Sequence, residues 1–542
     1  MKKLFLISLV ILIAISAILT SCGEEETTLP PTTAPKTTTP AATTPAETTP
    51  AVTTPAGPTG TLRATTPSWI ETLDPNLQTT FEYALYEHLL TIDENSNFAG
   101  ELATDWSVSE DGLVWTYNIR EGIKFHNGED FTAEDAKFSI ERIMKEGSMS
   151  PWAGEYKATI NHMETPDDYT LEIYCNLVNY MFYTSIWGCP MVPKDYIEAN
   201  GDAYFNEHPV GTSPWKFVKL TPGVSIEFEA VTDHWRLTPE WAHLIVELVP
   251  ESSTALAKLR RGETDIVDVN MDDAVQVRDE GFELRILGRP TTPVICMLGS
   301  WATEGPLANA KVREALSLAV NRQEISDTFF NGLAQPGGVV WTAPTSWGYD
   351  PNWSESAYFE YNPDKAKALL AEAGYPGAFA NPVVKIYSHP TQAWLPDMHM
   401  IVSSYWNAIG VQTEVINIDG GELRGKMYGG GNEDLWGAAC IWNMPTVQVS
   451  YAFLKSAIHS QGNWQLLHDE PWDTMWASIG QQPDQQKQMT AFRNTVEDML
   501  DRYVCVGIAN LYTHYAVSDV VGDWTLRFQY DLWGGFAGIK KR

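Results

Sequence analysis

The chain has 542 residues, enough for several folded units and a large buried core. Hydrophobic residues make up 44% of it and charged residues 19%, which is typical of globular proteins and excludes a fibrous or wholly disordered chain. The formal net charge is −33, from 36 Lys and Arg against 69 Asp and Glu, so phosphate backbones and anionic lipid surfaces would be repelled. We therefore expect a large acidic protein that binds no nucleic acid.

The N-terminus resembles the export signal of a bacterial lipoprotein. Lys2 and Lys3 precede an apolar run at 4–19, which is shorter than the about 20 residues that a membrane span needs. The run ends in Leu-Thr-Ser-Cys, similar to a lipobox, in which the Cys is acylated and the chain is cleaved before it. We predict a signal peptide at 1–21 and anchoring to the cell membrane, on its extracytoplasmic side, through Cys22. An uncleaved anchor helix is the alternative.

Residues 22–60 are predicted to form a tether. The segment consists largely of Thr, Pro and Ala, so it has too little apolar bulk to offset the entropy lost on ordering. Its prolines favour extended polyproline II structure, which would hold the globular body away from the membrane.

The remaining cysteines give no sign of a metal site. They have no CxxC spacing, and the histidines are dispersed, so we expect neither a metal ion nor a cofactor. Buried, unpaired thiols are the default expectation for Cys175, Cys189, Cys296, Cys440 and Cys505. A disulfide between Cys175 and Cys189 is the alternative that their spacing leaves open.

From residue 61 onward, strand and helix signals alternate, which predicts a mixed α/β protein. A strand is expected at 113–119, after an Asp-Gly turn. Thr132, with Asp135 three residues later, indicates the N-cap of a helix. A further helix is expected from Ser253 or Thr254 to Gly262, followed by a strand at 265–267.

Two later helices have especially clear signals. Apolar residues at helical spacing predict a helix at 312–320. Asn362 and Pro363 are typical of a cap and first turn, and Gly374 is expected to end that helix. Because no repeat of fixed period is present, a solenoid or propeller is disfavoured.

Motifs of enzyme chemistry are lacking in the sequence, and we predict no catalytic residues. It has no GxSxG and no HExxH pattern. The segment 420–426 approaches a phosphate-binding loop, but Met427 stands where a Ser or Thr must hold magnesium. A secreted polysaccharide hydrolase remains an alternative, because the carboxylates of such enzymes lie far apart in sequence.

Several ordered blocks resemble one protein family. The segments 101–112 (ELATDWSVSEDG), 119–129 (IREGIKFHNGE) and 131–136 (FTAEDA) are similar to the signature of the extracellular solute-binding proteins of family 5. These are the oligopeptide-, dipeptide- and nickel-binding components of ABC importers. The segment 209–215 (PVGTSPW) resembles the family's P-x-G-T-G-P-Y, and 313–322 and 365–374 resemble two of its helices.

The resemblance implies an α/β, periplasmic-binding-protein-like fold of the class II or cluster C type, with two lobes, an interlobe cleft and an extra third domain. The first lobe would comprise 61–88, 209–293 and 500–542. The extra domain would be 89–208, and the second lobe 294–499.

The resemblance also implies a function of capture and delivery without catalysis. A peptide or small-molecule ligand would bind in the cleft, hinge closure would bury it, and ABC permease and ATPase subunits would receive it. A monomer is expected. A surface adhesin or sensor with the same fold, uncoupled from transport, is a further alternative.

The identity of the ligand is left open at this point. In oligopeptide binders an Asp within a segment resembling A-D-Y-N-E-P-T holds the α-ammonium group, and Ile441 occupies that position here. One possibility is that Glu422, Glu433 or Asp434 supplies the missing carboxylate. The other is that the solute is neutral, apolar or an amine-blocked peptide, stacked on aromatic rings. The candidate ligand-binding residues are Thr80, Phe81, Tyr83, Trp436, Ile441, Trp442, Asn443 and Thr446.

Overall fold

The computed structural model describes most of the chain from residue 57 to its end. The described residues are 57–68, 72–77, 82–93, 97–301, 305–344, 346–355, 357–377, 379–428, 433–447, 449–462, 464–524 and 535–542. The predicted signal peptide, Cys22, nearly all of the predicted tether, Thr80 and Phe81 lie outside them. Within the described ranges, no helix combines the length and apolar character needed to cross a membrane.

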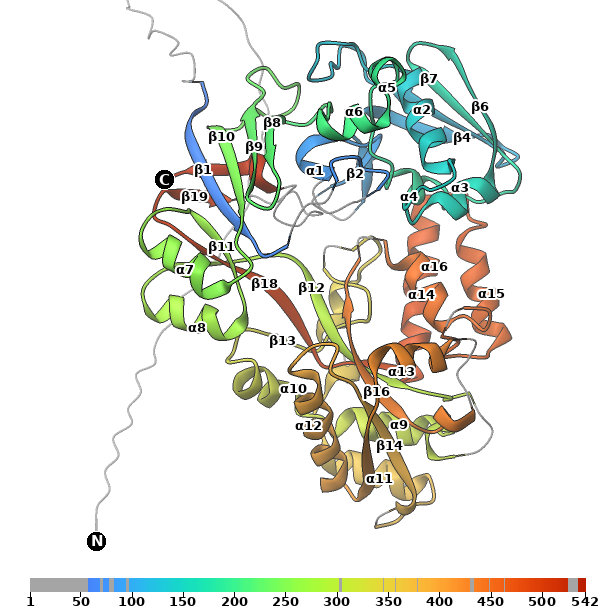
Figure 1. Ribbon diagram of the computed structural model, residues 1–542. Helices are drawn as coiled ribbons and strands as arrows, with labels where there is room; N and C mark the ends of the chain where they lie inside the picture. The colour runs from blue at the N-terminus through green and yellow to red at the C-terminus, as the bar shows by residue number, and fades with distance from the viewer. Residues whose placement is uncertain are drawn as a thin grey trace, which may run out of the picture. The chain divides into compact units, whose positions relative to one another are not determined.

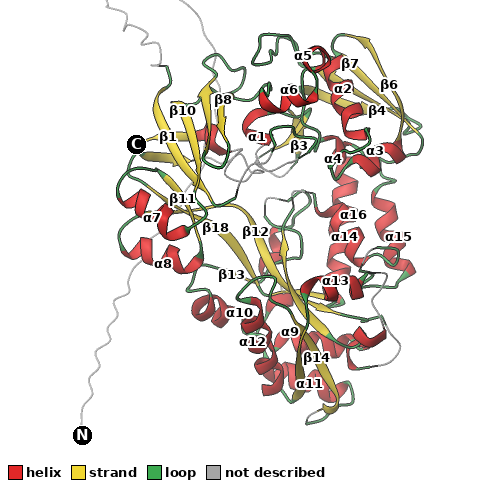
Figure 2. Ribbon diagram, viewed as in Figure 1, coloured by secondary structure: helices red, strands yellow, loops and turns green. Residues whose placement is uncertain are grey.

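One large mixed sheet of 12 strands organises the described residues (Figures 1 and 2). Its main path runs β15-β14-β16-β12-β18-β11-β1-β10-β9-β8, while β13 pairs with β18 and β17 with β12. The strands on the β8 side are β1 (Thr59–Thr66), β8 (Trp215–Thr221), β9 (Ser225–Ala230), β10 (Trp241–Leu248) and β11 (Ile266–Val269). Those on the other side are β14 (Phe379–Ser388), β15 (Val411–Asn417) and β16 (Ala439–Pro445).

The strand β12 (Glu283–Met297) belongs to both halves of this sheet. Its first part pairs antiparallel with β18 (Ala509–Val517), and its last part lies between β16 and β17 (Cys505–Gly507). A register shift between Leu287 and Thr291 separates the two parts. The paired strands β12 and β18 therefore connect the two halves of the sheet, as Figure 1 shows.

Helices cover both faces of the strands β14 to β16. One face carries α9 (Ala310–Leu318), α11 (Pro363–Glu372) and α12 (Leu395–Ala408), whose apolar stripes form one core cluster. The other face carries α14 (Ser450–Ile458), α15 (Glu470–Ile479) and α16 (Gln485–Asp501), which pack into a second cluster. The short helices α10 (Arg322–Glu324) and α13 (Gly420–Met427) complete this half, and β13 (Gln335–Pro336) lies against β18.

A separate antiparallel sheet lies within residues 89–208. Its order is β4-β5-β7-β6, and its strands are β4 (Ala103–Val108), β5 (Val114–Ile119), β6 (Ile160–Asp167) and β7 (Thr170–Cys175). The helices of this region are α2 (Ala133–Met144), α3 (Ala153–Thr159), α4 (Tyr183–Ile186), α5 (Lys194–Asn200) and α6 (Asp202–Glu207). The remaining elements are α1 (Glu82–Leu85), β2 (Leu90–Ile92), β3 (Phe98–Gly100), α7 (Ser252–Arg260), α8 (Met271–Asp279), β19 (Val521–Trp524) and β20 (Ile539–Lys541).

The local signals in the sequence correctly predicted several of these elements. Thr132 and Asp135 form the predicted capping box of α2, and β5 lies where a strand was expected. The side chain of Asn362 accepts a hydrogen bond from the backbone of Lys365 and caps α11. All five cysteines of the described chain are buried free thiols, Cys175 and Cys189 among them.

Candidate ligand-binding site

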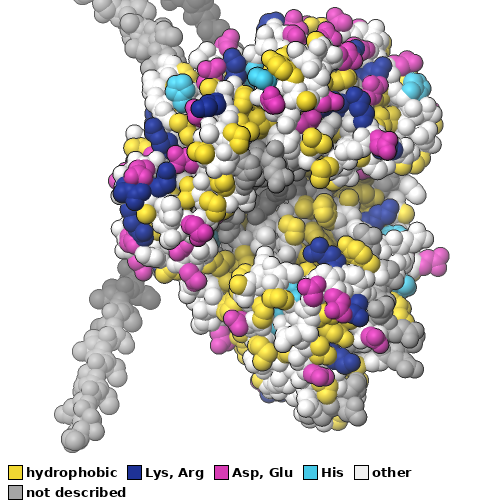
Figure 3. All heavy atoms as spheres, in the orientation of Figure 1, with side chains coloured by type: hydrophobic (Ala, Val, Ile, Leu, Met, Phe, Trp, Pro, Cys, Tyr) yellow, Lys and Arg dark blue, Asp and Glu magenta, His cyan; other side chains and the backbone are white. Residues whose placement is uncertain are grey.

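A cavity of about 460 Å³ lies where three distant parts of the chain meet. We call it the apolar cavity, because none of the described residues that line it is charged and most are apolar. Its walls are Pro75, Tyr83, Ser150, Pro151, Trp152, Trp187, Gly188, Pro190, Val447, Val449, Ala452, Phe453 and Ser456. These belong to segments near α1, to the residues just before α3 and just after α4, and to α14 with the residues that precede it. Figure 3 shows hydrophobic side chains bordering the hollow in the middle of one face.

Close packing of a glycine fixes one wall of the apolar cavity. A Cβ atom added at Gly188 would lie 2.0 Å from Nε1 of Trp152, far inside ordinary contact. The indole of Trp152 therefore rests directly on the backbone that follows α4, and only glycine leaves room for it there. Both residues line the cavity, so this contact sets the shape of its wall.

Hydrogen bonds join the region around α4 to the helices α15 and α16. The backbone N–H of Tyr180 donates to the carbonyl of Gly480 at 3.0 Å. The hydroxyl of Tyr183 donates to Oε1 of Gln488 at 2.9 Å, and Nε2 of Gln488 donates to the carbonyl of Tyr180 at 2.9 Å. Since Gln488 is buried, these bonds are shielded from water and tie the region around α4 to α15 and α16.

Of the residues predicted from the sequence near the N-terminus, Tyr83 lines the apolar cavity. Its ring centroid lies 5.1 Å from that of His88, and its carbonyl accepts a hydrogen bond from Ser213. Thr80 and Phe81 lie outside the described residues.

The predicted residues of β16 fall on different faces of the sheet. Ile441 is buried in the core beneath α9 and α12, opposite Ile295 of β12, and does not line the apolar cavity. Trp442 points to the other face, where its ring centroid lies 3.9 Å from that of His389. Asn443 is half-buried beside Pro293, and its Oδ1 atom has no hydrogen-bond partner among the described residues.

Two other predicted residues are held by contacts within the protein. The hydroxyl of Thr446 donates to the carbonyl of Pro290 at 2.6 Å and ties the end of β16 to β12. Trp436 packs edge-on against Trp301 at 4.9 Å, and Trp301 stacks on His468 at 4.0 Å. The structure thus assigns Trp436 to a different aromatic cluster from Trp442.

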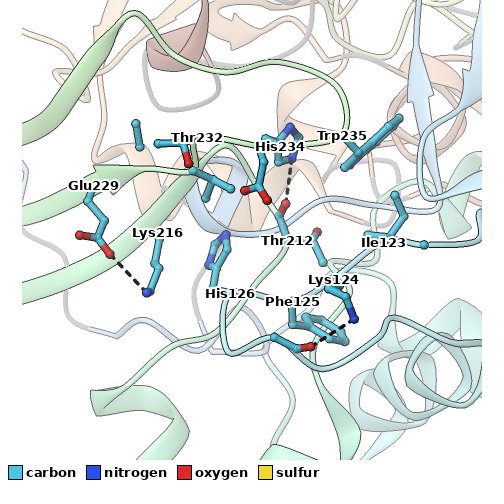
Figure 4. A pocket seen from close by; sticks show the side chains of 15 residues that line it. Ile123, Lys124, Phe125, His126, Thr212, Lys216, Glu229, Thr232, His234 and Trp235 are labelled. Carbon is cyan, nitrogen blue, oxygen red and sulfur yellow. Dashed lines mark hydrogen bonds and ion pairs between the residues drawn. The ribbon is translucent and has the colours of Figure 1, made fainter. Parts of the chain in front are cut away.

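A second hollow, of about 420 Å³, lies between residues 122–128 and the loop after β9 (Figure 4). We call it the polar cavity. His126 and His234 face it, and both use their ring nitrogens within the protein. Nε2 of His126 lies 2.8 Å from the carbonyl of Ser213, and Nε2 of His234 lies 2.9 Å from that of Thr212.

The hydrogen bonds of the polar cavity mark a structural junction rather than a ligand site. Nδ1 of His126 accepts from the backbone N–H of Gly211, so this ring is neutral with its proton on Nε2. Burial lowers the pKa of His126 to about 4, consistent with that state. Lys216 is paired with Glu229 at 3.2 Å. A Cβ at Gly211 would strike the carbonyl of Leu85 at 1.9 Å, which explains the glycine of this motif.

Beside this junction, two buried carboxylates share one arginine. Nη2 of Arg236 lies 2.5 Å from Glu87, and Nη1 lies 3.2 Å from Glu101. Burial acts to raise the pKa of Glu87, but Arg236 and His234 outweigh it and hold that pKa at about 2. Burial raises the pKa of Glu101 to about 7, against the lowering effect of Arg236 and with a further rise from Glu87. Of the two carboxyl groups, Glu101 therefore holds a proton to a higher pH than Glu87 does.

In the part of the chain that the structure describes, no group of His, Cys, Asp and Glu side chains could hold a metal ion. The apolar cavity, which is concave and lined mostly by apolar side chains, is the strongest candidate for a ligand site.

Comparisons with known proteins agree with this architecture. A family model described as bacterial extracellular solute-binding proteins, family 5 Middle, matches residues 97–461. The heme-binding protein A of Haemophilus influenzae is 27% identical over 373 residues, which cover 63% of this chain and 66% of that protein. The dipeptide-binding protein of Escherichia coli is 27% identical over 350 residues, which cover 59% of this chain and 63% of that protein.

Solved structures share the fold over nearly the whole described chain. HbpA2 from Haemophilus parasuis matches with a TM-score of 0.75 at 23% identity, covering 89% of this chain and 100% of that one. An ABC transporter substrate-binding protein from Listeria monocytogenes matches with a TM-score of 0.73 at 18% identity, covering 89% and 99%. The predicted periplasmic-binding-protein-like α/β fold is confirmed.

The family match extends over well more than half of the chain, and the chain belongs to family 5 of the bacterial extracellular solute-binding proteins. The resemblance seen in the sequence is therefore confirmed. It is a family of extracytoplasmic binding proteins rather than of enzymes.

Sequence reasoning missed most walls of the apolar cavity. Trp152, Trp187 and Phe453 lie outside the motifs that identified the family. The available signals were the Pro-Trp pair at 151–152 and the Trp-Gly-Cys-Pro run at 187–190, which group aromatic residues, proline and glycine between regular elements.

Proposed function

We propose that this chain is the lipid-anchored substrate-binding protein of an ABC importer, and that it captures peptides or a related small organic solute rich in apolar surface. The observation that supports this most directly is the apolar cavity, which has the concave, largely hydrophobic character of ligand sites. Cys22 anchors the chain to the membrane, residues 22–60 act as the tether, and the permease and ATPase subunits receive the solute after hinge closure.

We further propose that three domains supply the walls of the cavity. Lobe I comprises 61–88, 209–293 and 500–542, the extra domain 89–208, and lobe II 294–499. Support comes from the strands β1 and β8 to β11, which share one core cluster, and from the separate sheet formed within 89–208. In this division the paired strands β12 and β18 act as the hinge.

The lining of the apolar cavity favours solutes without a free ammonium group. A cation that is buried without a carboxylate costs several kcal/mol, and no described lining residue is charged. Ile441 supplies no carboxylate and packs in another core. By contrast, each buried aromatic or branched side chain of a ligand contributes about 2 kcal/mol. We therefore expect neutral, apolar or amine-blocked solutes to bind more tightly than free peptides.

Thermal unfolding of the full chain with matched peptides tests the proposal. N-acetyl-Phe-Leu is expected to raise the melting temperature more than Phe-Leu does, and Ser-Ser is the control that should have little effect. Equal shifts with Phe-Leu and N-acetyl-Phe-Leu would show that another carboxylate receives the ammonium group. Turnover of a glycan panel with no shift from any solute would contradict transport and favour a hydrolase.

A further inference from the structure

Three cysteines lie side by side on neighbouring strands of the large sheet. Cys296 of β12 is the middle one, with Cys440 of β16 directly opposite on one side and Cys505 of β17 directly opposite on the other. All three are buried, with exposed fractions of 0%, 0% and 3%. They are far apart in sequence, so only the fold brings them together.

The three thiols share one face of the sheet. They pack in the core cluster beneath α14 to α16. Their neighbours along the strands, Ile295, Ile441 and Val506, pack in the cluster on the opposite face. Because side chains alternate along a strand, this pattern places all three sulfur atoms in one row. The adjacent thiols of Cys440 and Cys505 lower the pKa of Cys296 against the effect of burial, which favours its thiolate.

Hydrogen bonding between the strands distinguishes the two possible pairs. On the β17 side, the backbone N–H of Met297 donates to the carbonyl of Val504 at 3.0 Å. The next pair along this antiparallel ladder, Cys296 and Cys505, is therefore a non-hydrogen-bonded pair. In such pairs the Cα atoms are about 4.5 Å apart and the side chains approach most closely, within the range that a disulfide spans.

On the β16 side the pattern is the reverse. The backbone N–H of Leu298 donates to the carbonyl of Ala438 at 2.9 Å. Cys296 and Cys440, two steps along from this pair, are therefore a hydrogen-bonded pair, with Cα atoms about 5.5 Å apart and side chains further from each other. Both Cα separations fall within the range that a disulfide spans, so it is the closer approach of the side chains that favours Cys505 over Cys440 as the partner of Cys296.

In the structure Cys296 and Cys505 are free thiols. We propose that they form a disulfide in the exported protein, with Cys440 remaining a thiol. This rests on the extracytoplasmic location of the family, since disulfides persist in oxidising compartments. Two thiols each lose a proton and together give two electrons to an external disulfide, which leaves as two thiols. The exchange occurs during folding, before α14 to α16 cover the sulfur atoms.

The bond would fix the part of the sheet where the chain returns from the α14 to α16 region. Cys505 begins β17, immediately before β18, and Cys296 lies near the end of β12. The disulfide would join these two strands covalently and close a long loop of chain, a constraint that acts mainly on the unfolded state. Reductant is therefore expected to lower the melting temperature of the oxidised protein.

Thiol labelling of the full chain, exported to a bacterial periplasm and purified without reductant, tests the proposal. The protein is unfolded in guanidinium with iodoacetamide and mapped by peptide mass spectrometry. Cys440 is expected to be labelled directly, Cys296 and Cys505 only after reduction, and a linked peptide should join these two. Because the labelling takes place in the unfolded protein and reads no ligand binding, its failure would leave the proposed transport function untouched.

Variants provide the matched controls. Cys440→Ser should keep the linked peptide, whereas Cys505→Ser should remove it. Direct labelling of all three thiols, or a peptide linking Cys296 to Cys440, would overturn the proposal. So would a thiophilic metal ion retained in native mass spectra of a protein whose three thiols are all free.

Discussion

Substituting Gly188 by Ala should deform the apolar cavity without touching any proposed lobe boundary. The new Cβ would lie 2.0 Å from Nε1 of Trp152, whereas ordinary contacts begin at 3.4 Å. The indole of Trp152 or the backbone at Gly188 must therefore shift by about 1.4 Å. Overpacking of this kind costs about 1–3 kcal/mol of folding free energy.

The same displacement should weaken ligand binding. Trp152 is one of the aromatic walls, and one aromatic contact is worth about 1 kcal/mol, or roughly a five- to tenfold change in Kd. Titration of Gly188→Ala with N-acetyl-Phe-Leu by isothermal calorimetry measures this loss, and differential scanning calorimetry measures the fall in melting temperature.

Gly154→Ala is the matched control. Gly154 lies two residues after Trp152, in α3, and an added Cβ there meets nothing within 4 Å. Because alanine favours a helix over glycine, this variant should be as stable as the parent or more so, with unchanged affinity. If Gly188→Ala behaves like Gly154→Ala in both measurements, Trp152 does not form the wall that the structure gives it.

Three further predictions concern other parts of the chain. The pKa of Glu101 rises from 4.5 to about 7 on folding, so the free energy of unfolding should fall by about 3 kcal/mol as the pH rises from about 4.5 to 7. Urea unfolding of Glu101→Gln across this range should lack this fall. If stability depends on pH in the same way in the variant and in the parent, the pKa shift is contradicted. Arg142→Met should lower the free energy of unfolding by about 3–5 kcal/mol, because it removes the guanidinium that lies 2.6 Å from the buried carboxylate of Asp74. An unchanged urea midpoint would refute this. Cys22→Ser should abolish incorporation of labelled palmitate and release the protein from the membrane fraction, and retention there would favour the uncleaved anchor helix.

The elements that the sequence predicted correctly depend on local chemistry. Thr132 and Asp135 satisfy each other's backbone groups within one turn. The side chain of Asn362 caps α11 through a single hydrogen bond from the backbone of Lys365. Such signals need no knowledge of the rest of the fold. The family motifs were informative for a related reason. Gly211 and His126 form a tight junction between distant segments, which few other residues could replace.

The ligand site was less predictable because it depends on tertiary packing. Trp152 becomes a cavity wall through its contact with Gly188, and no periodicity in the sequence reports that contact. Ile441 and Trp442 were both predicted to face a ligand, but adjacent residues of a strand point to opposite faces. Ile441 accordingly packs in the core beneath α9 and α12.

Native mass spectrometry of the full protein, before and after mild unfolding that strips bound solute, tests the central claim most directly. The account predicts an adduct of small mass on the native protein, its loss on unfolding, and its replacement by N-acetyl-Phe-Leu in preference to Phe-Leu. A protein that emerges empty and takes up neither peptide nor any other small solute would contradict a binding function for the apolar cavity.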